Sequence, residues 1–269
     1  MPLLEGLREH TIVHLKFVTR SRVLVGFASL LLLIAGVMLL PAIFIGTAAN
    51  RFELLKQVAD ELHAIAATIT AGLGLFVLWS HRRTRSIKLV ATRPGSFDAW
   101  VASLFIVPAM FGVAAQAAVA AITCGLSLYW DVPYQIGFFY LTVQWLAQSL
   151  IVLAYLTALG AVAHPVLAVL TLLFFNASTF HMLGVTLGGA IEAGYTSGFW
   201  RAAQSVVAML YYIAPTFSPL AQETSVVNET LRVAAIDWRY LAGVVAYALL
   251  TSAFGFMTTV VLLRRRQLT

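Results

Sequence analysis

The stretch His81-Arg-Arg-Thr-Arg-Ser-Ile-Lys-Leu-Val-Ala-Thr-Arg-Pro-Gly-Ser-Phe-Asp98 decides how the chain is arranged. It holds five of the 17 Lys and Arg residues, and the sequence on either side is almost uncharged for the length of a membrane span. By the positive-inside rule, a basic segment between two apolar runs is a cytoplasmic loop. The sequence therefore predicts a pair of membrane helices joined on the cytoplasmic side.

The interior of this loop mixes apolar and basic residues: Arg85, Ile87, Lys88, Leu89, Val90 and Arg93. A single turn of helix there would present both an apolar and a basic surface. Pro94-Gly95 then predicts a tight turn, because Pro presets φ and Gly accepts a positive φ. This pattern exceeds what solubility requires, so we hypothesise a short cytoplasmic helix that receives force from a partner protein.

The composition is that of an integral membrane protein. Of the 269 residues, 61% are hydrophobic and 10% are charged, whereas soluble domains are about a quarter charged. The mean hydropathy is +0.89. We predict one all-α polytopic domain over residues 1–269 with six transmembrane helices, each of roughly 20 residues or more. The predicted spans are 23–47, 62–80, 99–128, 134–163, 165–187 and 240–263.

The distribution of charge predicts one orientation. If the N-terminus is cytoplasmic and six spans alternate, the inner segments hold twelve basic and three acidic residues, and the outer segments hold five and eight. Every loop then obeys the positive-inside rule. We expect both termini to be cytoplasmic, and the net charge of +6 to report topology without a nucleic-acid partner. The first apolar run is too long for a signal peptide, so we expect it to be retained.

Residues 3–21 predict an amphipathic elbow helix on the membrane surface. At 100° per residue, one face carries Leu4, Leu7, Thr11, Leu15 and Val18. The opposite face carries Glu5, Glu9, Lys16 and Arg20. This pattern is typical of helices that lie in the membrane interface, and a plain anchor that leads into the first span is the commoner use of such a helix.

A long connection precedes the last span, from Gly188 to Asp237. Its middle, 199–213, is apolar apart from Arg201 and Gln204. Fifteen residues are too few to cross the hydrocarbon core, so we predict a re-entrant or interfacial helix.

The motifs of several enzyme classes are absent from the sequence. There is no G-x-x-x-x-G-K-[ST], no H-E-x-x-H and no G-x-S-x-G. We therefore expect no catalytic site, no cofactor and no metal in this chain. His10 and His14 have a possible metal-ligand spacing but lack a third ligand. The lone Cys124 excludes an internal disulfide.

Few polar residues lie at membrane depth, and such groups are functional candidates. Asn176 and His181 stand among Phe174, Phe180 and other large apolar residues. They either line a substrate route or form interhelical hydrogen bonds. Gln116, Gln144 and Gln148 are also buried in predicted spans, and packing is the preferred interpretation for the last two. No charged pair crosses the spans, so energy for transport would come from another subunit.

The order of these parts resembles the membrane subunit of bacterial ABC exporters of the ABC-2 type, over essentially the whole chain. The resemblance rests on an elbow helix, a basic inner loop reading Arg85-Ser-Ile-Lys-Leu-Val-Ala-Thr-Arg-Pro-Gly-Ser-Phe-Asp98, and an outer segment reading Tyr211-Tyr-Ile-Ala-Pro-Thr-Phe-Ser-Pro-Leu220. The tail Leu262-Leu-Arg-Arg-Arg-Gln-Leu268 is also similar to the family's ending. One departure is His81-Arg-Arg-Thr84, where the family has an acidic or Gly-rich start.

The resemblance implies a dimer of permease subunits in the bacterial inner membrane, each docking a separate ATPase subunit that binds ATP and Mg²⁺. The implied coupling residues are Arg85, Ile87, Lys88, Leu89, Arg93, Pro94 and Gly95. The implied substrate pathway, lined by the first, second and fifth spans, contains Phe174, Asn176, Phe180 and His181. The substrate would be lipid-like, drug-like or a peptide.

Two other classes remain open on the residues alone. One is a stand-alone secondary transporter or channel, against which the lack of buried charge counts. The other is a structural or sensory membrane subunit, for which the apolar outer segment would be a docking site.

Overall fold

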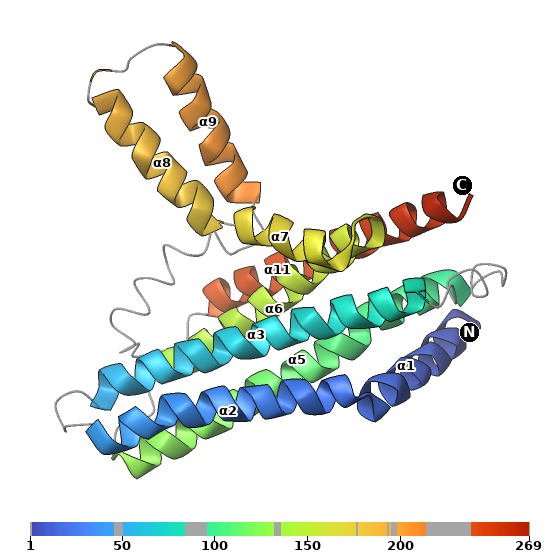
Figure 1. The fold of residues 1–269 in the computed structure, drawn as a ribbon, viewed down its shortest axis with the longest axis horizontal. Coiled ribbons are helices and arrows are strands. Elements are labelled where there is room, and N and C mark those ends of the chain that lie inside the picture. Colours follow the sequence, from blue (N-terminus) through green and yellow to red (C-terminus); the bar gives the residue numbers. More distant parts are fainter. Residues whose placement is uncertain are drawn as a thin grey trace.

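The computed structural model describes residues 2–45, 51–83, 96–131, 136–175, 177–192, 194, 198–213 and 238–268. Within these ranges every regular element is an α-helix, so the predicted all-α class is confirmed. The helices are α1 Pro2–Arg20, α2 Arg22–Ile45, α3 Arg51–Arg83, α5 Ser96–Tyr129, α6 Ile136–Val162, α7 Pro165–Phe174, α8 Ala177–Glu192, α9 Gly198–Ile213 and α11 Trp238–Leu268 (Figure 1).

Four described helices are long and apolar enough to cross a membrane, within α3, α5, α6 and α11. Helices α1 and α2 meet at a bend of 62°, and counting that pair as one span raises the number to five. The four long helices match the predictions over 62–80, 99–128, 134–163 and 240–263. The span predicted over 23–47 falls on α2, which counts as a span only together with α1, and residues 46–47 lie outside the described residues. The chain is thus a multi-pass membrane protein by length and composition, while six spans are not confirmed.

The single helix predicted over 165–187 is divided. Helix α7 ends at Phe174, and Phe175 leaves helical geometry with φ −95° and ψ 74°. The Phe175 N–H still donates to the carbonyl of Thr171, which closes the last turn of α7. The sequence that follows, Asn176-Ala-Ser-Thr, is rich in residue types that favour helix starts over helix interiors. Hydropathy alone does not register such a break.

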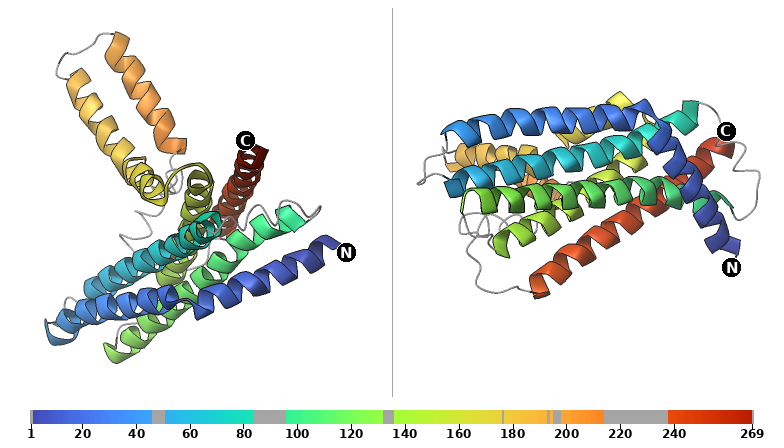
Figure 2. Two further views of the ribbon diagram at one scale, coloured as in Figure 1. Left: turned by 45° about the vertical axis from the view of Figure 1, so that its right-hand side comes forward. Right: turned by 90° about the horizontal axis from the view of Figure 1, so that it is seen from below.

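The long helices form one bundle in which α3 packs against α2, α5 and α6, and α11 packs against α6 (Figures 1 and 2). Helix α1 packs on α5. Helices α8 and α9 pair with each other as a hairpin that projects from the bundle (Figure 1). Both termini lie at the end of the bundle where α3 ends and α5 begins, and we call this the terminus end.

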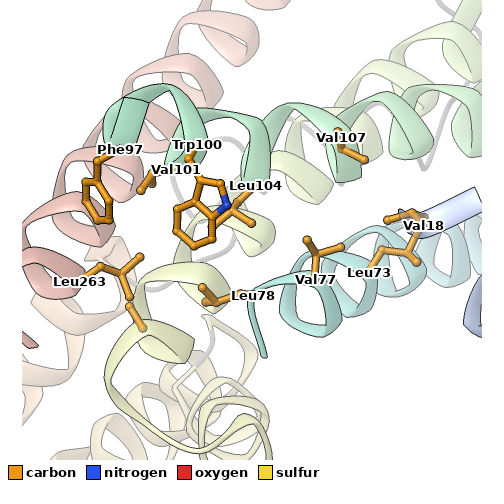
Figure 3. Close-up of a cluster of buried hydrophobic side chains, with 11 residues drawn as sticks. Val18, Leu73, Val77, Leu78, Phe97, Trp100, Val101, Leu104, Val107 and Leu263 are labelled. Carbon is orange, nitrogen blue, oxygen red and sulfur yellow. The ribbon is translucent and has the colours of Figure 1, made fainter. Parts of the chain in front are cut away.

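Among the described residues, one apolar core lies at the terminus end (Figure 3). Trp100 and Leu104 of α5 lie toward Leu78 of α3, with Leu263 of α11 alongside. The buried members come from α1, α3, α5, α6 and α11: Val18, Leu73, Val77, Leu78, Phe97, Trp100, Val101, Leu104, Val107, Ala161 and Leu263. Five helices are therefore packed together beside the segment that the sequence singled out.

Candidate functional site

The predicted coupling residues Arg85, Ile87, Lys88, Leu89, Arg93, Pro94 and Gly95 lie outside the described residues. What the structure describes is the pair of helix ends that carry them, Arg83 at the end of α3 and Ser96 at the start of α5. The candidate site is therefore the set of contacts that these two ends make with α1, α6 and α11.

Helix α1 packs on α5 through the face that periodicity predicted. Val18 is fully buried, Leu15 is partly buried, and Gly6 lies beside Ala99, where an added Cβ would make an ordinary van der Waals contact at 3.7 Å. The N-terminal end of that face is open, because Leu4 is 68% exposed. The elbow thus docks mainly by its second half.

His14 is the centre of this contact and is 1% exposed. The Ser103 hydroxyl donates to the carbonyl of Trp100 at 2.6 Å, and the His14 Nδ1 lies 2.7 Å from the same hydroxyl. The Ser103 hydroxyl therefore links the imidazole of α1 to the backbone of α5. The His14 ring also lies 4.7 Å from that of His81 and 5.9 Å from that of Trp100, between centroids.

This environment holds His14 neutral. Burial of the ring, followed by the neighbouring imidazoles of His81 and His10, lowers the pKa of His14 to about 3 from the ordinary 6.5. A protonated His14 would lose its hydrating water and would lie against the imidazole of His81. His14 therefore joins α1 to α3 and α5 only in its uncharged form.

Helix α11 is joined to the start of α5 by an ion pair. The Arg264 guanidinium lies 2.6 Å from the Asp98 carboxylate and 5.7 Å from the centre of the Phe97 ring. Both charged side chains are about half exposed, so the pair contributes little stability and serves mainly to fix position. Asp98 lies in the first turn of α5, where a carboxylate complements the helix dipole, and it also holds the end of α11.

The end of α3 is joined to the end of α6 by Arg82. Its guanidinium donates to the carbonyl of Gly160 and, at 2.6 Å, to the carbonyl of Ala163. These carbonyls belong to the last turn of α6, where intrahelical donors are missing and a cation complements the dipole. Arg82 also lies 5.6 Å from the centre of the Trp79 ring, which contacts His164, the residue that caps the start of α7.

The predicted pathway residues do not gather on one lining. Phe180 is buried inside the α8–α9 hairpin, with its ring 5.1 Å from that of Phe175. His181 is exposed, 6.2 Å from the ring of Tyr211, and Phe174 is 73% exposed at the end of α7. Asn176 lies outside the described residues. Their role in a route stays a prediction.

A second polar cluster lies inside the bundle at membrane depth. Gln116 of α5 bonds the His63 ring of α3 through its amide oxygen and donates to Ser149 of α6 at 3.2 Å. Thr142 lies 3.3 Å from the other ring nitrogen of His63. All four groups thus have partners within the cluster, which favours the interpretation of intramembrane polar residues as interhelical hydrogen bonds.

Sequence reasoning missed His14, Ser103 and Arg82 as contact residues. His14 was detectable, because it stands four residues before Val18 on the predicted apolar face. In the described part of the chain no three His, Cys, Asp or Glu residues are grouped as a metal site.

Comparisons with protein-family models, curated proteins and solved structures give no match. The geometry described above therefore carries the functional argument.

Proposed function

We propose that this chain is the permease subunit of an ATP-binding cassette exporter of the ABC-2 type. The observation that supports it best is the position of α1. This amphipathic helix packs across the helix that begins directly after the basic segment 84–95, and its His14 contacts the end of the helix that precedes it. Helix α1 thus contacts both helices that border the basic segment, which supports a shared docking site for a partner in this proposal.

In this proposal a separate ATPase subunit docks against residues 85–95 and α1, and it binds ATP and Mg²⁺. Displacement of the segment pulls on the end of α3 and the start of α5. Three polar ties pass the displacement to other helices. His14 with Ser103 joins α5 to α1, Asp98 with Arg264 joins α5 to α11, and Arg82 joins α3 to the end of α6. Force entering at one loop thereby reaches three further helices, α1, α6 and α11.

The proposal includes a second permease copy or homologue, with the substrate moving outward between the two. The route would pass Phe174, Asn176, Phe180 and His181, and the substrate would be lipid-like, drug-like or a peptide. Both termini would be cytoplasmic in the bacterial inner membrane, because the terminus end carries the excess of basic residues.

A stand-alone transporter or channel is the second candidate, and one observation favours it. The cluster of His63, Gln116 and Ser149 places polar groups at membrane depth, where such groups often mark substrate or ion routes. Because these groups bond one another, a route through them would require the bundle to open there.

The experiment purifies the chain from its native membrane and measures associated vanadate-sensitive ATP hydrolysis. We expect the wild-type complex to hydrolyse ATP, and Arg85→Glu with Lys88→Glu to lower the associated activity at least tenfold while the amount of inserted chain stays the same. Lys56→Glu with Arg201→Glu is the matched control, because these cations belong to predicted outer segments.

Two results would contradict the proposal. One is an intact assembly without any nucleotide-hydrolysing subunit. The other is transport by the lone chain in vesicles under an ion gradient, which would support the second candidate instead.

A further inference from the structure

A groove lies between α6 and α11 and opens at the surface of the bundle. The two helices cross where Gly255 faces Ala154, since a Cβ added to Gly255 would lie 2.7 Å from the Ala154 Cβ. The groove has a volume of about 420 Å³ and extends along both helices toward the terminus end. Its rims remain open, because Phe254 is 71% and Val162 is 54% exposed.

Small residues on both helices create the space: Ala154, Ala158, Ala163, Thr251, Gly255 and Thr258. The lining runs from Thr251 to Leu262 on α11, which is about 16 Å at 1.5 Å per residue. One leaflet of the hydrocarbon core is about 15 Å thick. The groove thus matches the depth of a single leaflet.

The width of the groove determines whether a helix or a lipid acyl chain can occupy it. The centres of water-sized molecules, about 1.4 Å in radius, reach a volume of about 420 Å³ over a length of about 16 Å, so the groove is roughly 8 Å wide between its walls. A helix with side chains is about 10–12 Å wide, so a helix from another chain or copy does not fit. An extended hydrocarbon chain is narrow enough.

The mouth of the groove at the terminus end is basic. The lining positions on α11 follow the helical row 251, 255, 258 and 262, and Arg265 is the next member of that row. Arg265 is exposed. Across the mouth, the carbonyl of Ala163, directly after the end of α6, accepts from Arg82. Asp98 is already engaged by Arg264, which lies on a different face of α11.

We propose that this groove binds one acyl chain of an anionic phospholipid from the leaflet at the terminus end, with the phosphate at Arg265. The apolar lining accepts the chain, and the cation at the mouth selects the headgroup. The site does not depend on the proposed transport role. It lies on the bundle surface, apart from the residues assigned to the substrate route.

The test reconstitutes the full-length chain in vesicles of phosphatidylcholine and phosphatidylglycerol at 3:1, with a trace of phosphatidylglycerol that carries a diazirine on its acyl chain. After illumination, the labelled peptides are identified by mass spectrometry. We expect labelling of 154–163 and 251–262 to exceed that of the exposed face of α5 about tenfold.

Ala158→Phe fills the groove and should lower this labelling at least fivefold, whereas Ala118→Phe on the exposed face of α5 should leave it unchanged. Thr258→Leu fills the groove from α11 and serves if Ala158→Phe does not fold. Arg265→Gln should lower labelling by the phosphatidylglycerol probe about fivefold and spare a phosphatidylcholine probe. Arg8→Gln, an exposed cation of α1, is its matched control.

Even labelling of all lipid-facing helices would overturn the proposal, as would unchanged labelling when either filling variant is folded. An equal effect of Arg265→Gln on both probes would overturn the assignment of the headgroup.

Discussion

Acidification should release helix α1 from the bundle, because His14 is held there only as a neutral ring. The pKa of His14 lies near 3 in the docked state, and an exposed histidine has a pKa near 6.5. A pKa lowered by docking means that the contact is fully favourable above about pH 6.5. It weakens as the pH falls from 6.5 toward 3, since only the undocked ring then binds a proton.

The size of the effect follows from the difference in pKa. At pH 4.5, an exposed His14 lies two units below its pKa and a docked His14 stays neutral, so docking loses about 2.7 kcal/mol at 1.36 kcal/mol per unit. This corresponds to about a hundredfold change in the docking equilibrium. The loss is comparable with burial of one apolar anchor such as Val18, worth about 1.5–3 kcal/mol.

The measurement is a distance distribution between nitroxide labels on α1 and α5, at Arg8→Cys and Met110→Cys. Both sites are exposed, and Cys124→Ser removes the natural thiol. Val18→Ala is added to weaken docking, so that the predicted change falls in a measurable range. Between pH 8 and pH 4.5, a second, longer distance should appear and become the major one.

His14→Phe should abolish this response while α1 stays docked, because a phenyl ring has a similar size and no proton to bind. His10→Gln should keep the response, since His10 is only a secondary neighbour. A distance that is constant with pH in the weakened chain would refute the reasoning. A response that persists in His14→Phe would assign the effect to another group, His81 being the first to test.

Three further predictions concern the packing of the bundle, and each is checked by thermal unfolding in one detergent. Arg82→Ala should destabilise the fold by about 2 kcal/mol, because the carbonyls at the end of α6 lose a charged donor, and Arg82→Lys should restore part of the loss. Gly255→Ala should destabilise by about 1–3 kcal/mol through overlap with Ala154, whereas Gly243→Ala, with open space around it, should be neutral or stabilising. Gln116→Leu should destabilise the fold by about 1–3 kcal/mol and leave transport by the folded protein unchanged, because Gln116 bonds neighbouring helices together. A transport defect without loss of stability would favour a polar route instead.

The sequence predicted the long apolar helices well, because hydropathy over about 20 residues is a strong signal. It also predicted the docked face of the elbow, where Leu15 and Val18 contact the bundle. It assigned Leu4 to the same contact, yet Leu4 is exposed, because periodicity gives the direction of a face and not the length over which a partner covers it.

Pathway residues were harder to predict. Phe180 and His181 are adjacent in sequence, and a helix directs neighbours to different faces, so one is buried in the α8–α9 hairpin and the other is exposed. Helix α7 ends at Phe174 because the next residue, Phe175, has a non-helical backbone conformation. A window that averages hydropathy over both helices cannot resolve one such residue.

The partners of the polar contacts at the terminus end could not be predicted from sequence, although the helix face that carries His14 could. In a membrane such contacts matter for a physical reason. Apolar faces gain little by leaving lipid for one another, so membrane helices are held in register by close packing and by polar groups. Here the polar ties join residues 81 to 166 positions apart: Arg82 to Ala163, His14 to Ser103, and Arg264 to Asp98. Each tie uses a side chain whose local pattern indicates only a helix end or a helix face. If a partner moves the basic segment 84–95, these three ties transmit the displacement from α3 and α5 to the other helices. Loss of all three ties should therefore uncouple the segment from those helices while the bundle stays folded.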